Sequence, residues 1–210
     1  MEMFFLIGFY NYTVWLTYLS MASSVVGISF ALNGKITCAI VCLLFSGLCD
    51  MFDGMVARTK KDRTEEEKSY GIQLDSLSDV VCFGVFPAVI GYCIGADAWW
   101  QVAILTFFAL AGLIRLAYFN VTEETRQKTE PGKRKYYEGV PISVSPLTVA
   151  LAFCFKNMAG AAFPAVYTLF LLVNGVAFIA PLKVKKPGKR GLITLISAGI
   201  VIFVAMLILK

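Results

Sequence analysis

The sequence contains no histidine among its 210 residues. This absence excludes imidazole metal ligands and the serine–histidine or cysteine–histidine pairs of many hydrolases. Cysteine occurs six times, but only in apolar segments and never as a CxxC pair, so we interpret these residues as small buried hydrophobic groups. Acid–base or metal chemistry in this chain must therefore rest on carboxylates.

Charged residues are also scarce. They make up 16% of the chain, whereas 58% of the residues are hydrophobic and the mean hydropathy is +0.73. Few soluble domains hide so much apolar surface, and runs of about 20 apolar residues, the length that crosses a bilayer, recur. We predict an all-α integral membrane protein in which residues 1–210 form a single polytopic transmembrane domain, a helical bundle without a separate soluble domain.

Seven apolar segments predict transmembrane helices. They cover residues 14–33, 36–57, 71–95, 98–119, 142–158, 162–182 and 191–209. Residues 1–13 begin with an acidic rather than a basic stretch and lack a nearby cleavage site. We therefore expect them to form an interfacial segment, with aromatic side chains at headgroup level.

Lysine and arginine are concentrated in three loops. Loops 58–70, 120–140 and 183–190 carry five of these residues each, whereas the opposite side of the predicted membrane carries only Lys35, Lys156 and Lys210. Because cytoplasmic loops are enriched in positive charge, we predict that the three loops face the cytoplasm. The N-terminus would then lie inside and the C-terminus outside.

The charged residues more than two positions from an end of a predicted span are Asp50, Asp53, Asp75, Asp79 and Arg115. Each costs about 2.5–3.5 kcal/mol at the centre of a membrane helix, so a functional role is the default hypothesis. The helical period places Asp50, Asp53, Gly54 and Ala57 on one face, and Gly71, Asp75 and Asp79 on another. Both faces adjoin loop 58–70, so two antiparallel helices would present four carboxylates to each other.

Crowded carboxylates repel one another unless positive charge lies among them. Arg58 and Arg115 would neutralise part of the charge, and a divalent cation would neutralise more. Oxygen ligands without histidine or cysteine suit Mg²⁺, Mn²⁺ or Ca²⁺ rather than zinc. The alternative is a pathway for cations. The small residues on the same faces favour ligand approach and tight helix packing equally.

The combined pattern is Asp50-x2-Asp53-Gly54-x2-Ala57-Arg58-x12-Gly71-x3-Asp75-x3-Asp79. It resembles the signature of the CDP-alcohol phosphatidyltransferases, with a longer gap after Arg58 than in many members. The stretches "LDSLSDVVCFGVFPA" (74–88), "GLIRLAYFN" (112–120) and "YYEGVPI" (136–142) resemble the serine-transferring branch, the CDP-diacylglycerol–serine O-phosphatidyltransferases. The family core is usually six helices, so the resemblance implies either that residues 191–209 form an additional helix or that one predicted span is a miscount.

The resemblance implies a reaction and a set of roles. CDP-diacylglycerol and L-serine would give phosphatidylserine and CMP at the cytoplasmic face of the plasma membrane. Asp50, Asp53, Asp75 and Asp79 would hold one or two Mg²⁺ or Mn²⁺ ions, and Asp79 would also be the catalytic general base. Gly54, Ala57 and Gly71 would make room for the cytidine of the CDP-lipid, and Arg58 would neutralise phosphate charge.

The serine site is less clearly marked. Arg115 is the one basic residue well inside a predicted span, and a guanidinium binds a carboxylate through two parallel hydrogen bonds. The alternative role for Arg115 is a structural partner of one of the aspartates. Arg134, Lys135 and Tyr136 precede the fifth predicted span and are further candidates to contact serine, or else an ordinary juxtamembrane run.

Partners and rival functions complete the prediction. The family resemblance implies a homodimer among membrane lipids, and we expect no nucleic-acid partner. One rival keeps the chemistry and changes the acceptor to glycerol 3-phosphate or an inositol phosphate, or the donor to an archaeal ether lipid. The rival from another class is a cation transporter, but its acidic residues would be spread through the membrane rather than gathered at one end.

Overall fold

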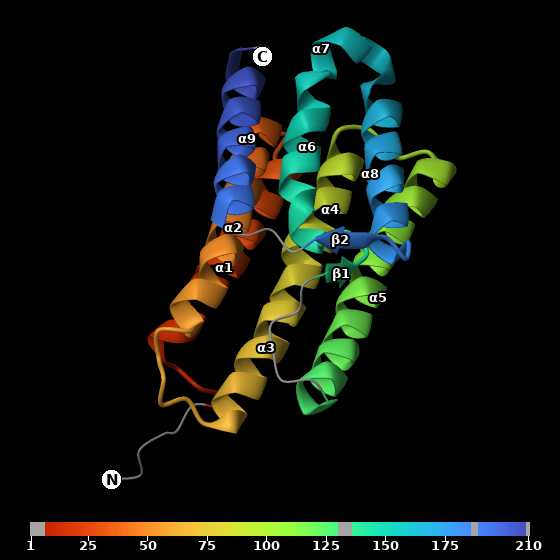
Figure 1. Ribbon diagram of the computed structural model, residues 1–210. Helices are drawn as coiled ribbons and strands as arrows, with labels where there is room; N and C mark the ends of the chain where they lie inside the picture. Colours follow the sequence, from red (N-terminus) through yellow and green to blue (C-terminus); the bar gives the residue numbers. More distant parts are fainter. Residues whose placement is uncertain (1–6, 130–135, 186–188, 209–210) are drawn as a thin grey trace.

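The computed structural model describes residues 7–129, 136–185 and 189–208 as a bundle of helices (Figure 1). Five helical segments are long and apolar enough to cross a membrane: Tyr12–Leu32, Ile36–Ala57, Glu65–Cys93, Trp99–Arg126 and Lys156–Ile179. Two shorter apolar helices cover Ile142–Cys154 and Ile196–Met206. The predicted class, a polytopic helical membrane protein, is confirmed.

The helices in chain order are α1 (Trp15–Leu32), α2 (Ile36–Ala57), α3 (Glu65–Asp79), α4 (Phe86–Cys93), α5 (Trp99–Thr129), α6 (Ser145–Cys154), α7 (Lys156–Ala159), α8 (Phe163–Ile179) and α9 (Lys189–Ile208). Short 3₁₀ turns are η1 (Tyr12–Val14), η3 (Ile142–Val144) and η4 (Gly160–Ala162), and η2 (Val80–Val85) is a π-helix. Two short strands, β1 (Tyr136–Glu138) and β2 (Lys183–Lys185), pair antiparallel.

Small polar residues hold α1 against α2. The Ser20 and Ser46 hydroxyl oxygens are 2.7 Å apart, and the Ser24 hydroxyl donates to Ser46 Oγ at 3.0 Å. All three serines are buried. Small side chains allow membrane helices to approach closely, and their hydroxyls then find partners across the interface. This contact fixes the end of α1 beside the aspartate-bearing end of α2.

The third long segment begins earlier than predicted, at Glu65 rather than at residue 71. A capping box starts it: the Glu67 amide donates to Thr64 Oγ1, and the Thr64 amide donates to the Glu67 carboxylate, both at 3.1 Å. After α3, the π-helix η2 has the Phe86 amide bonded to the Val81 carbonyl five residues back. Pro87 follows at once, and the wide turn gives its ring room that an α-turn lacks.

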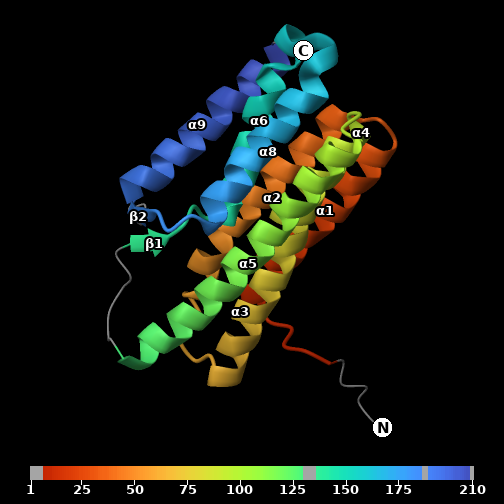
Figure 2. The same ribbon diagram turned by 90° about the vertical axis from the view of Figure 1, so that its right-hand side faces the viewer.

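Helix α5 continues to Thr129, about ten residues past the predicted span end at residue 119. The prediction of a loop from residue 120 was therefore wrong for this stretch. Asn120 Nδ2 donates to Ser76 Oγ on α3 at 2.8 Å. The ends of α3 and α5 project together at the lower end of the bundle (Figures 1 and 2).

The two-stranded sheet was not predicted. It places the chain after β1 against the end of α8 (Figure 1): the Gly139 amide donates to Leu182 O at 2.8 Å, and the Val140 amide donates to Ala177 O at 3.0 Å. Gly139 has φ +75°, a conformation that favours glycine, and a Cβ there would collide with the Phe178 carbonyl. The sheet thus fixes the course of residues 138–145 across the bundle.

The core of the bundle is aromatic. Phe83, Phe86, Phe108, Tyr167 and Phe178 are fully or almost fully buried where η2, α4, α5 and α8 meet. The Tyr167 hydroxyl donates to the Pro87 carbonyl at 2.8 Å, which satisfies its polar end inside this core. The core therefore anchors α4 and α8 on the side of the bundle away from loop 58–70.

Candidate active site

Three carboxylates from two helices converge at the lower half of the bundle. Oxygens of Asp50 on α2 and of Asp75 and Asp79 on α3 all lie within 4.8 Å of one another. The antiparallel pairing of α2 and α3 brings these residues to one depth, as the helical period predicts. Asp79 is only 9% exposed, so this group lies inside the protein rather than on its surface.

Asp53 lies beside this group rather than within it. It is 9% exposed and contacts Asp75, while Thr17 Oγ1 on α1 donates to Asp53 Oδ2 at 3.4 Å. Thr17 was not identified from the sequence, because a lone threonine in an apolar span carries no distinguishing signal. The structure therefore brings all four predicted aspartates into one neighbourhood and adds a hydroxyl from α1.

No ion pair seen among the described residues reaches the aspartate cluster. Those seen join Lys60 to Glu67, Lys68 to Glu65 and Arg126 to Glu123. Oδ1 of Asp75 is buried and has no hydrogen-bond partner there. A buried, unpartnered carboxylate oxygen is costly, and a bound cation removes that cost. An all-oxygen donor set fits Mg²⁺ or Mn²⁺.

Open space adjoins the cluster on the α2 side. A Cβ placed on Gly54 would meet nothing within 4 Å. Arg58 is exposed at the end of α2, immediately after Ala57. The predicted nucleotide-facing residues of α2 therefore border accessible space next to Asp53.

Gly71, the matching glycine of α3, is covered by Arg63. The Arg63 Nη2 atom would lie 2.6 Å from a Cβ on Gly71 and donates to Glu67 O at 3.0 Å, while Nη1 donates to Ala57 O at 3.5 Å. Arg63 was missed in the sequence because it stands among other charged loop residues. Its guanidinium links the end of α2 to the first turns of α3.

Residues 140–145 close the opposite side of the cluster. Ser143 contacts the Asp50 carboxyl group. The neighbouring Ile142 side chain occupies the surfaces left bare by two glycines, since a Cβ on Gly112 would lie 2.5 Å from Ile142 Cδ1 and one on Gly84 3.9 Å from it. These glycines let Ile142 insert between α5 and η2, which holds Ser143 beside Asp50.

Residues 10–180 match the family model described as CDP-alcohol phosphatidyltransferase. The chain belongs to this family. The resemblance inferred from the aspartate pattern is thereby confirmed. The match ends before α9.

The names of several relatives specify serine as the acceptor or a serine lipid as the product. This chain is 43% identical over 114 residues to a CDP-diacylglycerol–serine O-phosphatidyltransferase of Saccharomyces cerevisiae. The match covers 53% of this chain and 40% of the yeast protein. It is 29% identical over 166 residues to an archaetidylserine synthase of Methanothermobacter thermautotrophicus, over 78% of this chain and 67% of that protein. A CDP-diacylglycerol–serine O-phosphatidyltransferase of Helicobacter pylori is 30% identical over 140 residues, 66% of this chain and 55% of its own length. The chain thus spans only part of these relatives.

Arg115 of the phosphatidyltransferase is 8% exposed on α5. Its Nε donates to the Val140 carbonyl at 3.1 Å, and its guanidinium carbon lies 5.1 Å from the centre of the Phe119 ring. It forms part of a cavity of about 300 Å³, together with Tyr118, Glu138 and apolar residues of α5 and of the end of α8. The Tyr118 hydroxyl donates to the Glu138 carboxylate at 2.8 Å. Tyr118 and Glu138 were not predicted as site residues, because the strand that places them together was not predicted.

The remaining serine candidates are not brought to this cavity by any described contact. Arg134 and Lys135 lie outside the described residues. Tyr136 is the first residue of β1 and stands opposite Lys185 in the sheet. Of the predicted serine residues, Arg115 alone is placed by the structure in a described cavity.

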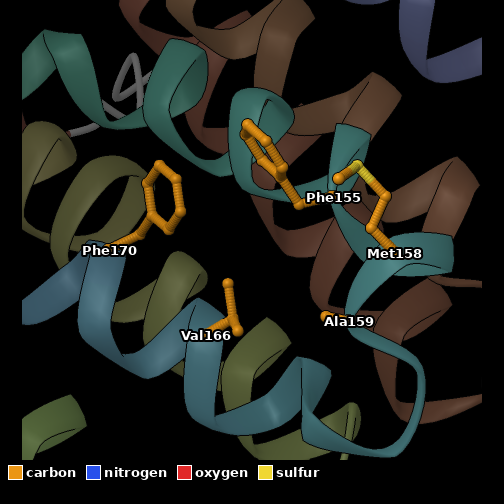
Figure 3. Close-up of a pocket in the computed structure, with 5 residues that line it drawn as sticks. All are labelled: Phe155, Met158, Ala159, Val166 and Phe170. Carbon is orange, nitrogen blue, oxygen red and sulfur yellow. The ribbon is translucent and has the colours of Figure 1, made fainter.

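A second cavity of about 240 Å³ lies far from the aspartates, where α7 joins α6 to α8. Phe155, Met158, Ala159, Val166 and Phe170 line it (Figure 3). These side chains include no ionisable group and no hydroxyl. The cavity therefore has no chemistry for phosphoryl transfer, and its apolar lining suits contact with lipid chains.

Proposed function

We propose that this enzyme transfers the phosphatidyl group of CDP-diacylglycerol to the hydroxyl of L-serine, giving phosphatidylserine and CMP. The observation that carries the proposal is the group of three partly buried carboxylates from α2 and α3, with the buried, unpartnered Asp75 Oδ1 among them. Membership of the family supports the donor class, and the names of the relatives support serine as the acceptor.

In this proposal Asp50, Asp53, Asp75 and Asp79 hold one or two Mg²⁺ or Mn²⁺ ions. A bound ion would neutralise charge on the diphosphate and on the departing CMP. Asp79 accepts the proton of the serine hydroxyl as that oxygen bonds to the phosphorus and the phosphoanhydride bond to CMP breaks. Its near-complete burial keeps bulk water away from this proton transfer.

The donor nucleotide occupies the space beside α2 and α3. Gly54 has open space at its Cβ position, which allows a ribose or base to approach the backbone. Ala57 and Gly71 are proposed to border the same nucleotide site, with the Arg63 guanidinium lying over Gly71. Arg58 is exposed and can turn toward a phosphate. The lipid chains of the donor remain in the bilayer.

L-Serine binds in the cavity that contains Arg115. The guanidinium of Arg115 binds the serine carboxylate, and Glu138 with Tyr118 binds the ammonium group. One cation and one carboxylate suit a zwitterion better than a phosphorylated acceptor, which favours several cations. Arg134, Lys135 and Tyr136 are proposed to contact serine from the segment before β1 and from its first residue.

The membrane arrangement is part of the same proposal. Seven helical segments cross the bilayer, with α9 added to the family core, and residues 1–210 form one catalytic domain whose first 13 residues lie at the interface. The three basic loops face the cytoplasm, so CMP and serine exchange on that side of the plasma membrane. The enzyme is a homodimer in this proposal.

The decisive experiment is an acceptor panel. Purified protein in lipid nanodiscs receives CDP-diacylglycerol, Mn²⁺ or Mg²⁺, and in turn L-serine, glycerol 3-phosphate or an inositol phosphate, and CMP release is followed. Release with serine alone is expected. Release only with a phosphorylated acceptor refutes the serine assignment, and no release with any acceptor refutes the transferase reading of this chain.

The similarity to an archaetidylserine synthase favours one second candidate, the same reaction with an ether-linked donor. The panel is therefore repeated with a CDP-activated diether lipid. A higher kcat/KM for the diether than for the diester donor would support that candidate, because the acceptor and the metal are held constant.

A further inference from the structure

We infer that Arg63 recognises the cytosine base of the donor, with its guanidinium donating to the acceptor atoms of the ring. The inference deepens the proposed function and rests on it. Arg63 stands in the loop between α2 and α3 and covers Gly71, the glycine whose bare surface faces the proposed nucleotide site. Nothing in the family signature includes this arginine.

The placement of the guanidinium is constrained on two sides. Nη1 donates to Ala57 O at the end of α2, and Nη2 donates to Glu67 O in the first turns of α3. Glu67 is itself held by the capping box with Thr64 and by an ion pair with Lys60 at 2.9 Å. Arg63 is therefore positioned by backbone carbonyls of both helices rather than by a carboxylate that would neutralise it.

One guanidinium nitrogen of Arg63 makes neither of these hydrogen bonds. Its Nε is buried and has no hydrogen-bond partner among the described residues. A buried N–H without an acceptor is unfavourable, and an acceptor supplied by a ligand removes that penalty. The same guanidinium lies against Gly71, where its Nη2 atom would be 2.6 Å from a Cβ and occupies the space that a side chain would fill.

The helix geometry selects the base rather than the diphosphate as the ligand group. Gly71 precedes Asp75 and Asp79 by four and eight residues, so it lies about 6 Å and about 12 Å from them along the helix axis. If the aspartate cluster holds the diphosphate, the part of the CDP-lipid that lies at Gly71 is the cytosine base, because the ribose separates the base from the diphosphate.

Cytosine also matches a guanidinium chemically. Its O2 and N3 atoms are adjacent acceptors, which suit the parallel N–H groups of arginine. Uracil keeps O2 but carries a hydrogen on N3, so it presents a donor to one of those N–H groups. A contact from Arg63 to the base therefore discriminates CMP from UMP, whereas a contact to phosphate does not.

The test measures competitive inhibition constants of CMP and UMP against CDP-diacylglycerol for the whole protein in nanodiscs. Arg63→Ala should weaken CMP inhibition about tenfold to a hundredfold, the usual effect of losing a charged hydrogen bond, and change UMP inhibition little. The KM for serine should stay the same. Lys61→Ala is the matched control, because Lys61 is an exposed loop cation two residues away, and it should leave both constants unchanged.

Other outcomes overturn the inference. An equal loss for CMP and UMP indicates a phosphate contact, and tighter CMP binding indicates that Arg63 merely blocks the site. Unchanged constants show that it does neither. Arg63→Lys, which keeps the charge but not the paired donors, serves if the alanine variant does not fold, and it should also lower the CMP-to-UMP preference. If wild-type protein binds no CMP, the proposed function itself fails. If wild-type binds CMP and the variants match it, only the role of Arg63 fails.

Discussion

Replacing Gly139 with alanine should disturb the segment that runs from β1 to Ser143. Gly139 adopts φ +75°, and an added Cβ would collide with the Phe178 carbonyl. The left-handed conformation costs an alanine about 1–2 kcal/mol. Because the colliding atom belongs to the backbone of α8, relief requires movement of β1 or of α8, which adds about 1–3 kcal/mol, as in overpacked cores. The expected loss of stability is about 2–5 kcal/mol.

Gly34 provides the matched control. It has φ +72°, almost the same as Gly139, but nothing lies within 4 Å of its Cβ position. Gly34→Ala should therefore show only the conformational cost, about 1–2 kcal/mol. The difference between the two variants isolates the collision with Phe178, independently of the shared backbone strain.

Two assays read the effect. In thermal unfolding experiments in detergent, Gly34→Ala should lower the apparent Tm by about 3–6 °C, and Gly139→Ala should lower it by at least twice as much. The serine KM should rise in Gly139→Ala alone, because Val140 O accepts a hydrogen bond from Arg115 and moves with its neighbour. Equal Tm shifts for both variants would refute the collision argument, and an unchanged serine KM would show that this segment does not position Arg115.

Four further substitutions test the site and the core. Asp79→Asn should lower kcat about a thousandfold while CDP-lipid binding persists, and retained turnover in a steady-state assay would remove Asp79 as the base. Arg115→Lys should raise the serine KM about tenfold but not the donor KM, because lysine lacks the paired donors; equal effects would indicate a structural role. Asp75→Asn should weaken Mn²⁺ binding, measured by electron paramagnetic resonance, about tenfold or more, and unchanged affinity would contradict its role as a ligand. Tyr167→Phe should cost about 1–2 kcal/mol of stability without a change in either KM, since it removes the buried bond to Pro87; no change in Tm would show that the bond contributes nothing.

The aspartate cluster was predictable because its geometry is local. Asp75 and Asp79 are one helical turn apart, and the short connection to α2 brings Asp50 to the same depth. Periodicity and loop length are enough to specify such a site. The same reasoning yields the membrane class, because span length and hydropathy reflect the thickness of the bilayer.

Elements outside the apolar runs were harder to predict. The hydropathy of α5 falls near residue 119, but the helix continues through polar residues, where Glu123 and Arg126 form an ion pair at 2.7 Å. Hydropathy marks where lipid ends and not where a helix ends. The strands contain three residues each, too few for an alternating pattern, and they depend on pairing between segments about 45 residues apart. Glu138 reaches the Arg115 cavity only through that pairing.

The π-helix η2 allows the residues before it and after it in one continuous helical segment to face different neighbours. Its wide turn holds one more residue than an α-turn, and each residue of a helix turns by about 100°. The aspartates before it can thus face α2 while Phe86 and Ile90 after it face the aromatic core. If the six residues of η2 formed an α-helix instead, the two halves of the segment would be rotated against each other by about 100°. The rotation of the helix at this one turn therefore sets both how Phe86 and Ile90 pack in the core and the direction in which the aspartates face.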